Sequence, residues 1–352
     1  MEFEENQPLA PFTTLGIGGP ARWFAEVASE EEIAEAADWA RRRGLPLFVL
    51  GGGSNLVVSD AGFDGLVLHV ALRGVEVEVR AGELSEQAQQ PARIYRVAAG
   101  EDWDGFVDRA LKDNCAGIEC LAGIPGTVGG TPVQNVGAYG QEVASVVERV
   151  RAYDLEANAF VELTAGECGF SYRRSRFNST DRGRFVVTRV DYRLVPGGAP
   201  VLTYPDVQRA MERLRAAGID ATLAKVAAVV RAIRHAKGML LVDGDPDCRS
   251  AGSFFKNPVI STELCQKIAA RSAFPAGPGM VKVPAAWLIE QTGFRKGYGR
   301  GGAAISSKHM LALVNRDGAT AAEILALAGE IAAAVETRFG IRLEVEPVMV
   351  GC

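Results

Sequence analysis

The sequence has few of the residues that hold metals or build disulfide frameworks. It contains three histidines, and its six cysteines are spread along the chain without a C-x-x-C pair. Structural zinc sites need closely spaced cysteine or histidine ligands, and disulfide frameworks are typical of short secreted chains. We therefore expect no metal site and no disulfide framework, and we expect the cysteines to be small, buried apolar side chains.

The sequence also lacks an excess of positive charge. With 38 lysines and arginines against 43 aspartates and glutamates, the formal net charge is −5. A protein that binds nucleic acid or an acidic membrane surface electrostatically usually carries a basic excess. The charge balance therefore argues against a nucleic-acid partner and against a membrane partner.

Long apolar segments are missing as well. No stretch reaches the roughly 18 uninterrupted apolar residues of a membrane span. The first six residues, MEFEEN, are acidic and lack the basic and then apolar pattern of a signal peptide. We therefore expect a cytoplasmic protein. The sequence does not determine the oligomeric state, for which a monomer is our expectation.

Glycine, in contrast, is abundant. The chain has 40 glycines among 352 residues, which is about 11% where the average is about 7%. The length predicts two or three domains of roughly 150 residues each. Because glycine lets the backbone turn left-handed or approach a ligand closely, clusters of glycine are the first places to look for a binding site.

Local signals predict four helices. Two begin with a capping box, in which a serine or threonine is followed three residues later by a glutamate, and both end at a glycine. Of the other two, one shows apolar residues on a single helical face and one is a short helix around residue 103. These helices are expected after Ser29, after Thr320, and over residues 103–111 and 222–236.

Short apolar runs and alternating segments predict strands. The runs at residues 45–50, 56–58 and 66–70 follow the first helix and predict a small α/β layer. Residues 100–145 combine a short helix with a glycine-rich run, and residues 149–194 alternate as strands, so the middle third is predicted to be mixed α+β. Between these parts, residues 73–96 are polar and irregular, and we interpret them as a solvated excursion of strand and loop rather than as core.

The first glycine cluster, at residues 51–55, reads Gly-Gly-Gly-Ser-Asn and follows an apolar strand. Residues without Cβ let successive N–H groups turn toward phosphate oxygens, although a tight turn would explain the cluster equally well. The cluster does not match the G-x-G-x-x-G dinucleotide fingerprint, and the chain has no Gly-Lys pair for a Walker A loop. A literal G-x-G-x-x-G match at residues 297–302 follows no buried strand, so we interpret it as a chance match in a surface loop.

The second cluster spans residues 117–140 and is more specific. It reads GIECLAGIPGTVGGTPVQNVGAYG, with glycines throughout an otherwise apolar segment. Core packing alone does not require so many glycines. Such a segment can wrap a large cofactor through backbone N–H and C=O groups, and together with the first cluster it suggests a flavin dinucleotide.

Six ordered blocks resemble the UDP-N-acetylenolpyruvoylglucosamine reductase family, also called UDP-N-acetylmuramate dehydrogenase. The resemblance covers nearly the whole chain. The blocks are TTLGIGGPA at 13–21, LGGGSNL at 50–56, the glycine-rich residues 124–140, SYRRS at 171–175, AGSFFKNP at 251–258 and LEVE at 343–346.

The resemblance implies an α+β protein with an FAD-binding fold of the vanillyl-alcohol oxidase type. The implied parts are two α/β FAD-binding subdomains, at residues 1–70 and 71–220, and a C-terminal α+β substrate-binding domain at residues 221–352 whose final strand carries a catalytic glutamate. The implied reaction belongs to peptidoglycan precursor synthesis. It reduces UDP-N-acetylglucosamine enolpyruvate to UDP-N-acetylmuramate, with NADPH as hydride donor and non-covalent FAD as cofactor.

The resemblance assigns the chemistry to three side chains. Hydride addition to the terminal vinyl carbon leaves negative charge on the neighbouring carbon and its carboxylate, which preorganised donors must stabilise. Arg173 matches the family's arginine that holds the carboxylate, Ser253 matches its proton donor, and Glu346 matches its catalytic glutamate. Glu344 stays an alternative to Glu346, because Pro347 follows where the family usually has a hydrophobic residue.

The resemblance also implies ligand-binding residues. For the UDP-sugar these are Tyr172, Tyr204, Lys237 and Asn257, with Tyr204 on a loop that closes over the substrate. For FAD they lie in the two glycine clusters. The FAD set is Gly51, Gly52, Gly53, Ser54, Asn55, Gly117, Pro125, Gly126, Gly129, Gly130, Gln134, Asn135, Gly137, Ala138 and Tyr139.

Two other functions are weighed against the reductase. A flavin oxidase of the same superfamily often tethers its flavin to a histidine in the first glycine loop, where this chain has Ser54. A nucleotide-binding scaffold without activity would be expected to have lost at least one of Arg173, Ser253 and Glu346. The sequence therefore favours the reductase.

Overall fold

The computed structural model describes residues 1–84, 91–270 and 272–352. The chain divides into two compact units. The first unit contains residues 1–7, 21–52 and 64–235, and the second contains residues 8–20, 53–63 and 236–352. Each unit is thus assembled from segments that are distant in the sequence.

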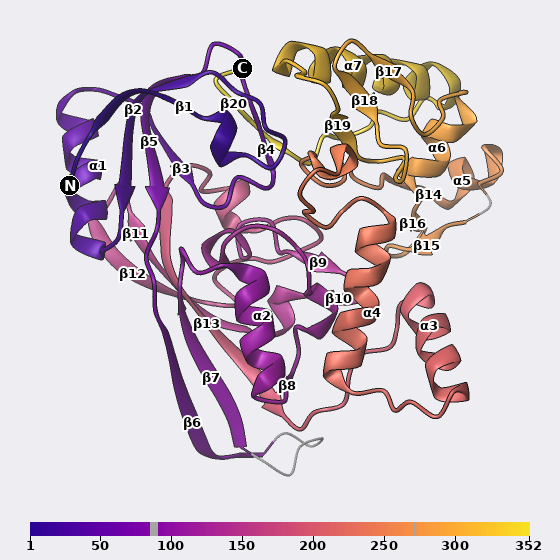
Figure 1. The fold of residues 1–352 in the computed structure, drawn as a ribbon, viewed down its shortest axis with the longest axis horizontal. Helices are drawn as coiled ribbons and strands as arrows, with labels where there is room; N and C mark the ends of the chain where they lie inside the picture. Colours follow the sequence, from indigo (N-terminus) through magenta and orange to yellow (C-terminus); the bar gives the residue numbers. More distant parts are fainter. Residues whose placement is uncertain (85–90, 271) are drawn as a thin grey trace. The chain divides into compact units, whose positions relative to one another are not determined.

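The first unit contains a six-stranded antiparallel sheet (Figure 1). Its strands are hydrogen-bonded in the order β12-β11-β13-β7-β6, and β8 pairs with the last residues of β13. Valine, isoleucine and tyrosine fill the inward positions, which suits a pleated, half-buried surface. The strands are β6 (Val75–Leu84), β7 (Pro91–Ala98), β8 (Cys115–Ala116), β11 (Val147–Asp154), β12 (Ala159–Thr164) and β13 (Phe185–Pro196).

A four-stranded sheet of order β1-β2-β5-β3 lies in the same unit. Strands β3 and β5 are parallel, and helix α1 lies between β2 and β3 in the sequence. Ser29 caps α1 by accepting the N–H of Glu32, whose own carboxylate accepts the N–H of Ala28. The elements are β1 (Glu4–Pro8), β2 (Pro20–Val27), α1 (Glu30–Arg42), β3 (Leu47–Leu50) and β5 (Phe63–Val70).

An aromatic cluster joins helix α2 (Trp103–Lys112) to the six-stranded sheet. The rings of Trp103, Phe106 and Tyr192 lie 5.1 to 5.9 Å apart between centroids, and all three are buried. Trp103 Nε1 donates to the carbonyl of Leu121 at 3.1 Å, and the Tyr192 and Thr131 hydroxyls are 2.6 Å apart. The core therefore anchors the glycine-rich segment at two points, besides contributing the apolar burial that stabilises the sheet.

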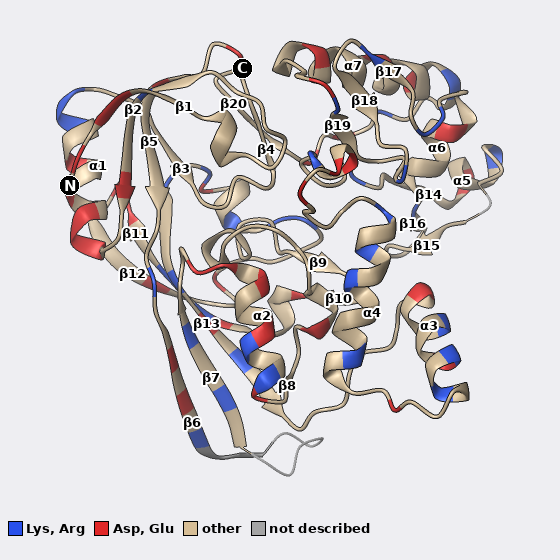
Figure 2. Ribbon diagram, in the orientation of Figure 1, with Lys and Arg blue, Asp and Glu red and all other residues tan. Residues whose placement is uncertain are grey.

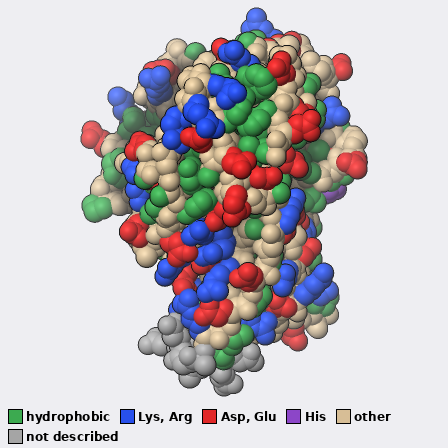
Figure 3. Space-filling view, turned by 90° about the vertical axis from the view of Figure 1, so that its left-hand side faces the viewer, with side chains coloured by type: hydrophobic (Ala, Val, Ile, Leu, Met, Phe, Trp, Pro, Cys, Tyr) green, Lys and Arg blue, Asp and Glu red, His purple; other side chains and the backbone are tan. Residues whose placement is uncertain are grey.

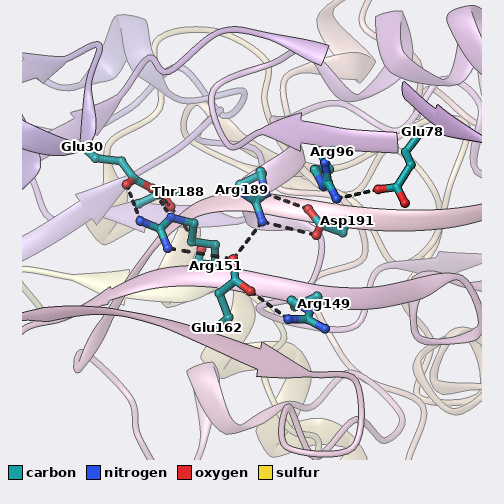
Figure 4. A network of polar contacts seen from close by, with 9 residues as sticks. All are labelled: Glu30, Glu78, Arg96, Arg149, Arg151, Glu162, Thr188, Arg189 and Asp191. Carbon is teal, nitrogen blue, oxygen red and sulfur yellow. Dashed lines mark hydrogen bonds and ion pairs between the residues drawn. The ribbon is translucent and has the colours of Figure 1, made fainter. Parts of the chain in front are cut away.

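Charged side chains cover one face of the six-stranded sheet (Figure 4). Arg189 and Arg149 both pair with Glu162, at 3.0 and 2.8 Å. Arg151 forms a two-point ion pair with Glu30 of α1, at 2.7 and 2.8 Å. This pairing lowers the pKa of the Glu30 carboxyl, because the guanidinium favours its charged form. Exposed ion pairs contribute little each, so the main effect is to fix α1 against the sheet.

Acidic and basic side chains alternate elsewhere on the chain too. Figure 2 shows both signs on α2 and on β6, and Figure 3 shows them interspersed with hydrophobic side chains on one face. On that face the charged side chains of both signs are therefore mixed and do not form a patch of one sign.

Two more helices belong mainly to the first unit. Helix α3 (Pro205–Ala216) begins with a proline at its first position, where the missing N–H is harmless. Helix α4 (Leu223–Ala236) buries Val226, Val230 and Arg234 along one side. The glycine-rich segment contributes a two-stranded ladder, β9 (Gly137–Ala138) with β10 (Gln141–Glu142).

The second unit has its own core around α7 (Ala321–Phe339). Its capping box is complete, since Thr320 accepts the N–H of Glu323 and Glu323 accepts the N–H of Thr320, and Gly340 ends the helix in a left-handed conformation. The other elements are β4 (Leu56–Val58), β14 (Val259–Ser261), α5 (Thr262–Lys267), β15 (Phe274–Pro275), β16 (Met280–Lys282), α6 (Ala285–Gln291), β17 (Gly299–Arg300), β18 (Ala303–Ile305), β19 (Leu313–Asn315) and β20 (Val348–Val350).

All six cysteines, each in a described part of the chain, are free thiols, and five of them are buried as expected. The expectation is wrong for Cys352, which is exposed. Burial raises the pKa of the Cys120 and Cys168 thiols to about 12, so both stay protonated near neutral pH. Within the described ranges, none of the helices is both long and apolar enough to span a membrane.

The four predicted helices are confirmed as α1, α2, α4 and α7. Two predictions about strands are wrong. Residues 56–58 do not join the layer of β3 and β5, because β4 pairs with β20 in the second unit. Residues 73–96 are not only a solvated excursion, because β7 buries Ala92, Ile94 and Tyr95; residues 85–90 lie outside the described residues. The division at residues 70 and 220 stays a prediction.

Candidate functional site

The two glycine clusters lie against each other within the first unit. A Cβ on Gly52 would fall 2.5 Å from the Gly126 Cα, and a Cβ on Gly51 would fall 2.8 Å from the Thr127 Oγ1. Real Cβ atoms do not approach that closely, so the first of these contacts requires backbone against backbone. The end of β3 and the segment around Gly126 therefore form one continuous backbone surface.

The remaining residues of the first cluster belong to the second unit. Gly53 has a left-handed φ of +60°, and a Cβ there would fall 1.8 Å from the Phe12 carbonyl oxygen. Asn55 lies beside the C-terminal segment: its Nδ2 donates to the Glu346 carbonyl at 3.4 Å, and its own carbonyl accepts the Val348 N–H at 2.9 Å. Asn55 thereby helps to fix the segment that carries Glu346.

At two glycines of the second cluster, neighbouring protein atoms occupy the space that a Cβ would need. A Cβ on Gly117 would fall 2.8 Å from Val146, and one on Gly129 would fall 2.6 Å from Ala99. The expectation that packing does not explain these glycines is therefore wrong at both positions. At Gly130, in contrast, a Cβ would meet nothing within 4 Å.

Asn135 is buried and its side chain is used inside the protein. Its Nδ2 donates to Glu142 at 2.9 Å and to the Ser171 carbonyl at 3.0 Å, and its Oδ1 accepts the Ala144 N–H at 3.1 Å. Its φ of +47° lies in the left-handed region, which asparagine tolerates better than most residues. Any contact from Asn135 to a ligand would therefore come from its backbone.

Gln141 offers a donor at the end of the same segment. Its Oε1 accepts the Cys120 N–H at 2.7 Å, which sets the orientation of the amide. Its Nε2 is buried and has no hydrogen-bond partner among the residues that the structure describes. A buried donor left unpaired is costly, by about 1–3 kcal/mol. The sequence patterns gave no signal for this side chain, and an oxygen-rich ligand is the kind of partner that it lacks.

Arg173 lies over the glycine-rich segment in the first unit. Its Nη2 donates to the Gly137 carbonyl at 2.7 Å, and its guanidinium stacks on the Tyr172 ring at 5.3 Å from the ring centroid. Arg173 has a left-handed φ of +54°, unusual for a residue with a long side chain. The turn is held by the Asn178 amide, which donates to the Arg173 carbonyl at 3.1 Å.

The neighbouring arginines differ from Arg173. Arg174 is exposed. Arg176 pairs with Asp181 at 2.8 Å. Tyr204, the residue before α3, is partly exposed and meets Tyr139 edge to face at 5.2 Å between ring centroids. The first unit thus brings Tyr139 together with Tyr204, and Gly137 together with Arg173.

The backbone segments that carry Ser253 and Glu346 are hydrogen-bonded to each other in the second unit. The Glu346 N–H donates to the carbonyl of Phe254, the residue after Ser253, at 2.9 Å. Phe254 and Phe255 are buried, so this connection is fixed by the core. Glu344, which precedes Val345 of the Phe255–Val345 bridge, is exposed and forms an ion pair with Lys256 Nζ at 2.5 Å. The two glutamates therefore have different surroundings.

Lys237 and Asn257 also belong to the second unit. Lys237 follows the end of α4, and the next residue, Gly238, turns left-handed against Asp247. Asn257 Oδ1 accepts the Ala285 N–H at 2.9 Å and so caps the start of α6. The side-chain oxygen of Asn257 is thus used within the protein, so its side-chain Nδ2 is the group that could bind a ligand.

Sequence reasoning missed several residues that hold the glycine-rich segment. They include Trp103, Asp104 and Arg234, which contact residues 121–126 from α2 and α4. No local pattern marks them, because their partners are distant in the sequence. Among the described residues, no group of three or more His, Cys, Asp or Glu side chains could hold a metal ion.

The residues present fit a flavin dinucleotide. Glycine backbone lines the place where the two clusters meet, and a Cβ on Gly130 would meet open space. Among the described residues, the buried Gln141 Nε2 has no hydrogen-bond partner. A diphosphate is bound well by such backbone surfaces, since N–H groups can approach its oxygens.

Comparisons with known proteins agree with this fit. A family model described as FAD binding domain matches residues 21–159, and one described as UDP-N-acetylenolpyruvoylglucosamine reductase, C-terminal domain, matches residues 245–350. The chain is similar to the UDP-N-acetylenolpyruvoylglucosamine reductase of Thermobifida fusca, at 46% identity over 99% of this chain and 98% of the relative. It is 45% identical to that of Streptomyces coelicolor, over 98% of this chain and 90% of the relative.

A solved structure is similar over the whole length. The crystal structure of UDP-N-acetylenolpyruvylglucosamine reductase from Thermus caldophilus matches with a TM-score of 0.65 and 27% identity, covering 99% of this chain and 98% of that one. Together with the FAD-binding match, this confirms the predicted α+β, FAD-binding fold.

Proposed function

Because this chain belongs to the UDP-N-acetylenolpyruvoylglucosamine reductase family, we propose that it uses NADPH to reduce UDP-N-acetylglucosamine enolpyruvate to UDP-N-acetylmuramate. Its enzyme class is that of the family, UDP-N-acetylmuramate dehydrogenase, an FAD-dependent oxidoreductase of peptidoglycan precursor synthesis. Residues 1–70 and 71–220 are assigned to FAD and residues 221–352 to the UDP-sugar.

Backbone groups of the two glycine clusters would hold the FAD. Gly51, Gly52 and Gly126 support this assignment, because the two clusters lie against each other there and backbone N–H groups without neighbouring Cβ atoms can approach diphosphate oxygens. FAD, when bound, supplies the means to accept a hydride from one partner and pass it to another. The absence of a histidine from residues 51–55 supports non-covalent binding.

Arg173 is assigned to the carboxylate of the enolpyruvyl group. A planar guanidinium can present two parallel N–H groups to a carboxylate, which lysine cannot do. The Gly137 carbonyl and the Tyr172 ring orient the side chain, which supports a preorganised role. As hydride reaches the vinyl carbon, the fixed positive charge stabilises the electron pair that moves toward the carboxylate.

The pairing of Glu346 N–H with the Phe254 carbonyl is the single observation that best supports the catalytic assignment. It bonds the Glu346 backbone to Phe254, the residue after Ser253, whereas the Glu344 side chain forms an ion pair with Lys256. We assign proton donation to the Ser253 hydroxyl and charge stabilisation to Glu346, which needs its proton to favour a developing anion.

The UDP-sugar is assigned to Tyr172, Tyr204, Lys237 and Asn257. Partial exposure of both tyrosines supports contact with a ligand, and a lysine charge suits a diphosphate or a carboxylate. The Tyr139 contact supports a position for Tyr204 beside the flavin segment of the first unit.

The visible spectrum of the purified protein tests the proposal. Under anaerobic conditions, NADPH should bleach the yellow flavin, and UDP-N-acetylglucosamine enolpyruvate should restore the colour with formation of UDP-N-acetylmuramate. Recovery with oxygen alone, and none with this substrate, would favour an oxidase. Flavin that NADPH cannot bleach would contradict the proposed hydride donor.

A further inference from the structure

The peptide groups around Gly123 are held by charged side chains from two helices. Asp104, in the first turn of α2, accepts the Gly123 N–H at 2.6 Å. Arg234, in the last turn of α4, donates its Nε–H to the Gly123 carbonyl at 2.9 Å. Gly123 itself has a left-handed φ of +73°, a conformation that favours glycine.

Burying the Arg234 guanidinium carries a desolvation cost. Arg234 is only 6% exposed, and burial lowers the pKa of its guanidinium because desolvation penalises the charged form. Tyr139, through a side-chain hydrogen bond, and the Asp104 carboxylate both favour the charged guanidinium and so offset part of this desolvation penalty. The buried guanidinium therefore connects the Gly123 carbonyl to α2 and to the glycine-rich segment.

The segment that follows Gly123 reaches the meeting point of the glycine clusters within three residues. The carbonyl of Gly126 accepts the Trp103 N–H at 3.0 Å, and Gly126 and Thr127 lie against Gly52 and Gly51. The four-residue stretch 123–126 is thus fixed by hydrogen bonds at its first and its last residue. Because both ends are fixed, the directions of the N–H groups at residues 126 and 127 are fixed as well.

We propose that Asp104 and Arg234 are positioning residues that clamp Gly123 and thereby preset the backbone at residues 123–127 to bind the diphosphate of FAD. The clamp acts before FAD arrives, so it lowers the ordering cost of binding. The inference rests on the cofactor assignment made under the proposed function.

The matched control is Arg231, one turn earlier on α4. Arg231 Nη2 pairs with Asp104 at 2.6 Å and with Asp108 at 2.7 Å, and neither of these contacts involves Gly123. Replacing Arg231 removes a cation from the same helix and the same aspartate without removing a bond to the clamped glycine.

The experiment compares FAD dissociation constants of the full-length apoprotein and its variants, measured by flavin fluorescence well below each unfolding midpoint. Arg234→Met should weaken FAD binding about tenfold or more, since a charge-assisted bond is lost. Arg234→Lys should be intermediate, because it keeps the charge without the guanidinium geometry. Arg231→Met should stay within about threefold of the parent, as expected for a partly exposed ion pair.

Amide hydrogen exchange supplies a second readout that does not depend on turnover. The Gly123 amide should be protected in the parent apoprotein and in Arg231→Met, and should exchange faster in Arg234→Met until FAD saturates the protein. A lower unfolding midpoint of Arg234→Met with an unchanged FAD dissociation constant would mean a structural role only, and would overturn the inference.

Gly52→Ala separates this inference from the cofactor assignment. The added Cβ would press on the Gly126 backbone, so FAD affinity should fall if the clusters form the cofactor site. Unchanged affinity in Gly52→Ala would overturn the assignment itself. Weakened affinity in Gly52→Ala with unchanged affinity in Arg234→Met would overturn the clamp alone.

Discussion

At the scale of single residues, neighbours in the sequence receive different surroundings from the fold. Glu344 and Glu346 are two positions apart, yet one is exposed and paired with Lys256 while the other has its backbone bonded beside Ser253. A salt bridge at the surface contributes little and is easily replaced. The difference gives two residue-scale predictions.

Replacing Ser253 should separate the two half-reactions. Ser253→Ala should leave anaerobic flavin reduction by NADPH within about twofold and slow flavin reoxidation by the enolpyruvyl substrate about 100-fold or more, the range of a lost general acid. Stopped-flow absorbance of the flavin measures both rates in one protein, so the reductive rate is the internal control. Equal slowing of both rates would show that Ser253 is not the proton donor.

Replacing the glutamates should distinguish them. Glu346→Ala should lower kcat about 100-fold, as for the loss of one preorganised donor, whereas Glu346→Gln keeps an N–H donor and should lose less. Glu344→Ala, the matched control, should stay within about twofold because its side chain pairs with Lys256 at the surface. Steady-state rates at saturating substrate test this, and a greater loss in Glu344→Ala would reverse the assignment.

At the scale of elements, the β11–β12 hairpin depends on one buried carboxylate. Asp154 accepts the N–H groups of Glu156 and Ala157 and forms an ion pair with Arg184 at 2.6 Å. The Arg184 guanidinium lowers the pKa of Asp154 to about 2 from its ordinary value of 3.8. Because the folded-state pKa is depressed, the stabilisation is present above the unfolded-state pKa and is lost as pH falls toward the folded-state value.

Asp154→Asn should therefore destabilise the protein in a pH-dependent way. At pH 7 the free energy of unfolding should fall by about 2 kcal/mol, since one pKa unit corresponds to about 1.4 kcal/mol. The difference from the parent should shrink between about pH 5 and pH 2. Urea unfolding at several pH values measures it, with Glu156→Gln, an exposed partner of Arg184, as a control of small effect. A difference that persists undiminished at pH 2.5 would contradict the ion-pair explanation.

Helix ends were predictable at this scale because capping is local. Ser29 and Thr320 find their partners within three residues, so the sequence alone places α1 and α7. Strand partners are not local. In β7, Arg93 and Arg96 flank the adjacent buried residues Ile94 and Tyr95, and the burial of these two becomes clear only from the neighbouring strands. Residues 73–96 were misjudged for that reason.

At the scale of the whole molecule, FAD should stabilise the folded chain by mass action. Free FAD at 100 times its dissociation constant should add about 2.7 kcal/mol to the free energy of unfolding, and each further tenfold about 1.4 kcal/mol. Thermal unfolding across FAD concentrations measures the effect. Riboflavin, which lacks the diphosphate, should give a much smaller shift at equal concentration, and an equal shift would contradict diphosphate recognition by the glycine clusters.

The sequence by itself determined the helices with capping boxes, the two glycine clusters and the six blocks that identify the family, because each is encoded within a few consecutive residues. The tertiary structure decided the rest. It pairs β4 with β20, sets Gly52 against Gly126, holds Gly123 between Asp104 and Arg234, and bonds the Glu346 backbone to Phe254. These contacts join residues tens to hundreds of positions apart, and local periodicity carries no information about which distant backbone will supply the partner.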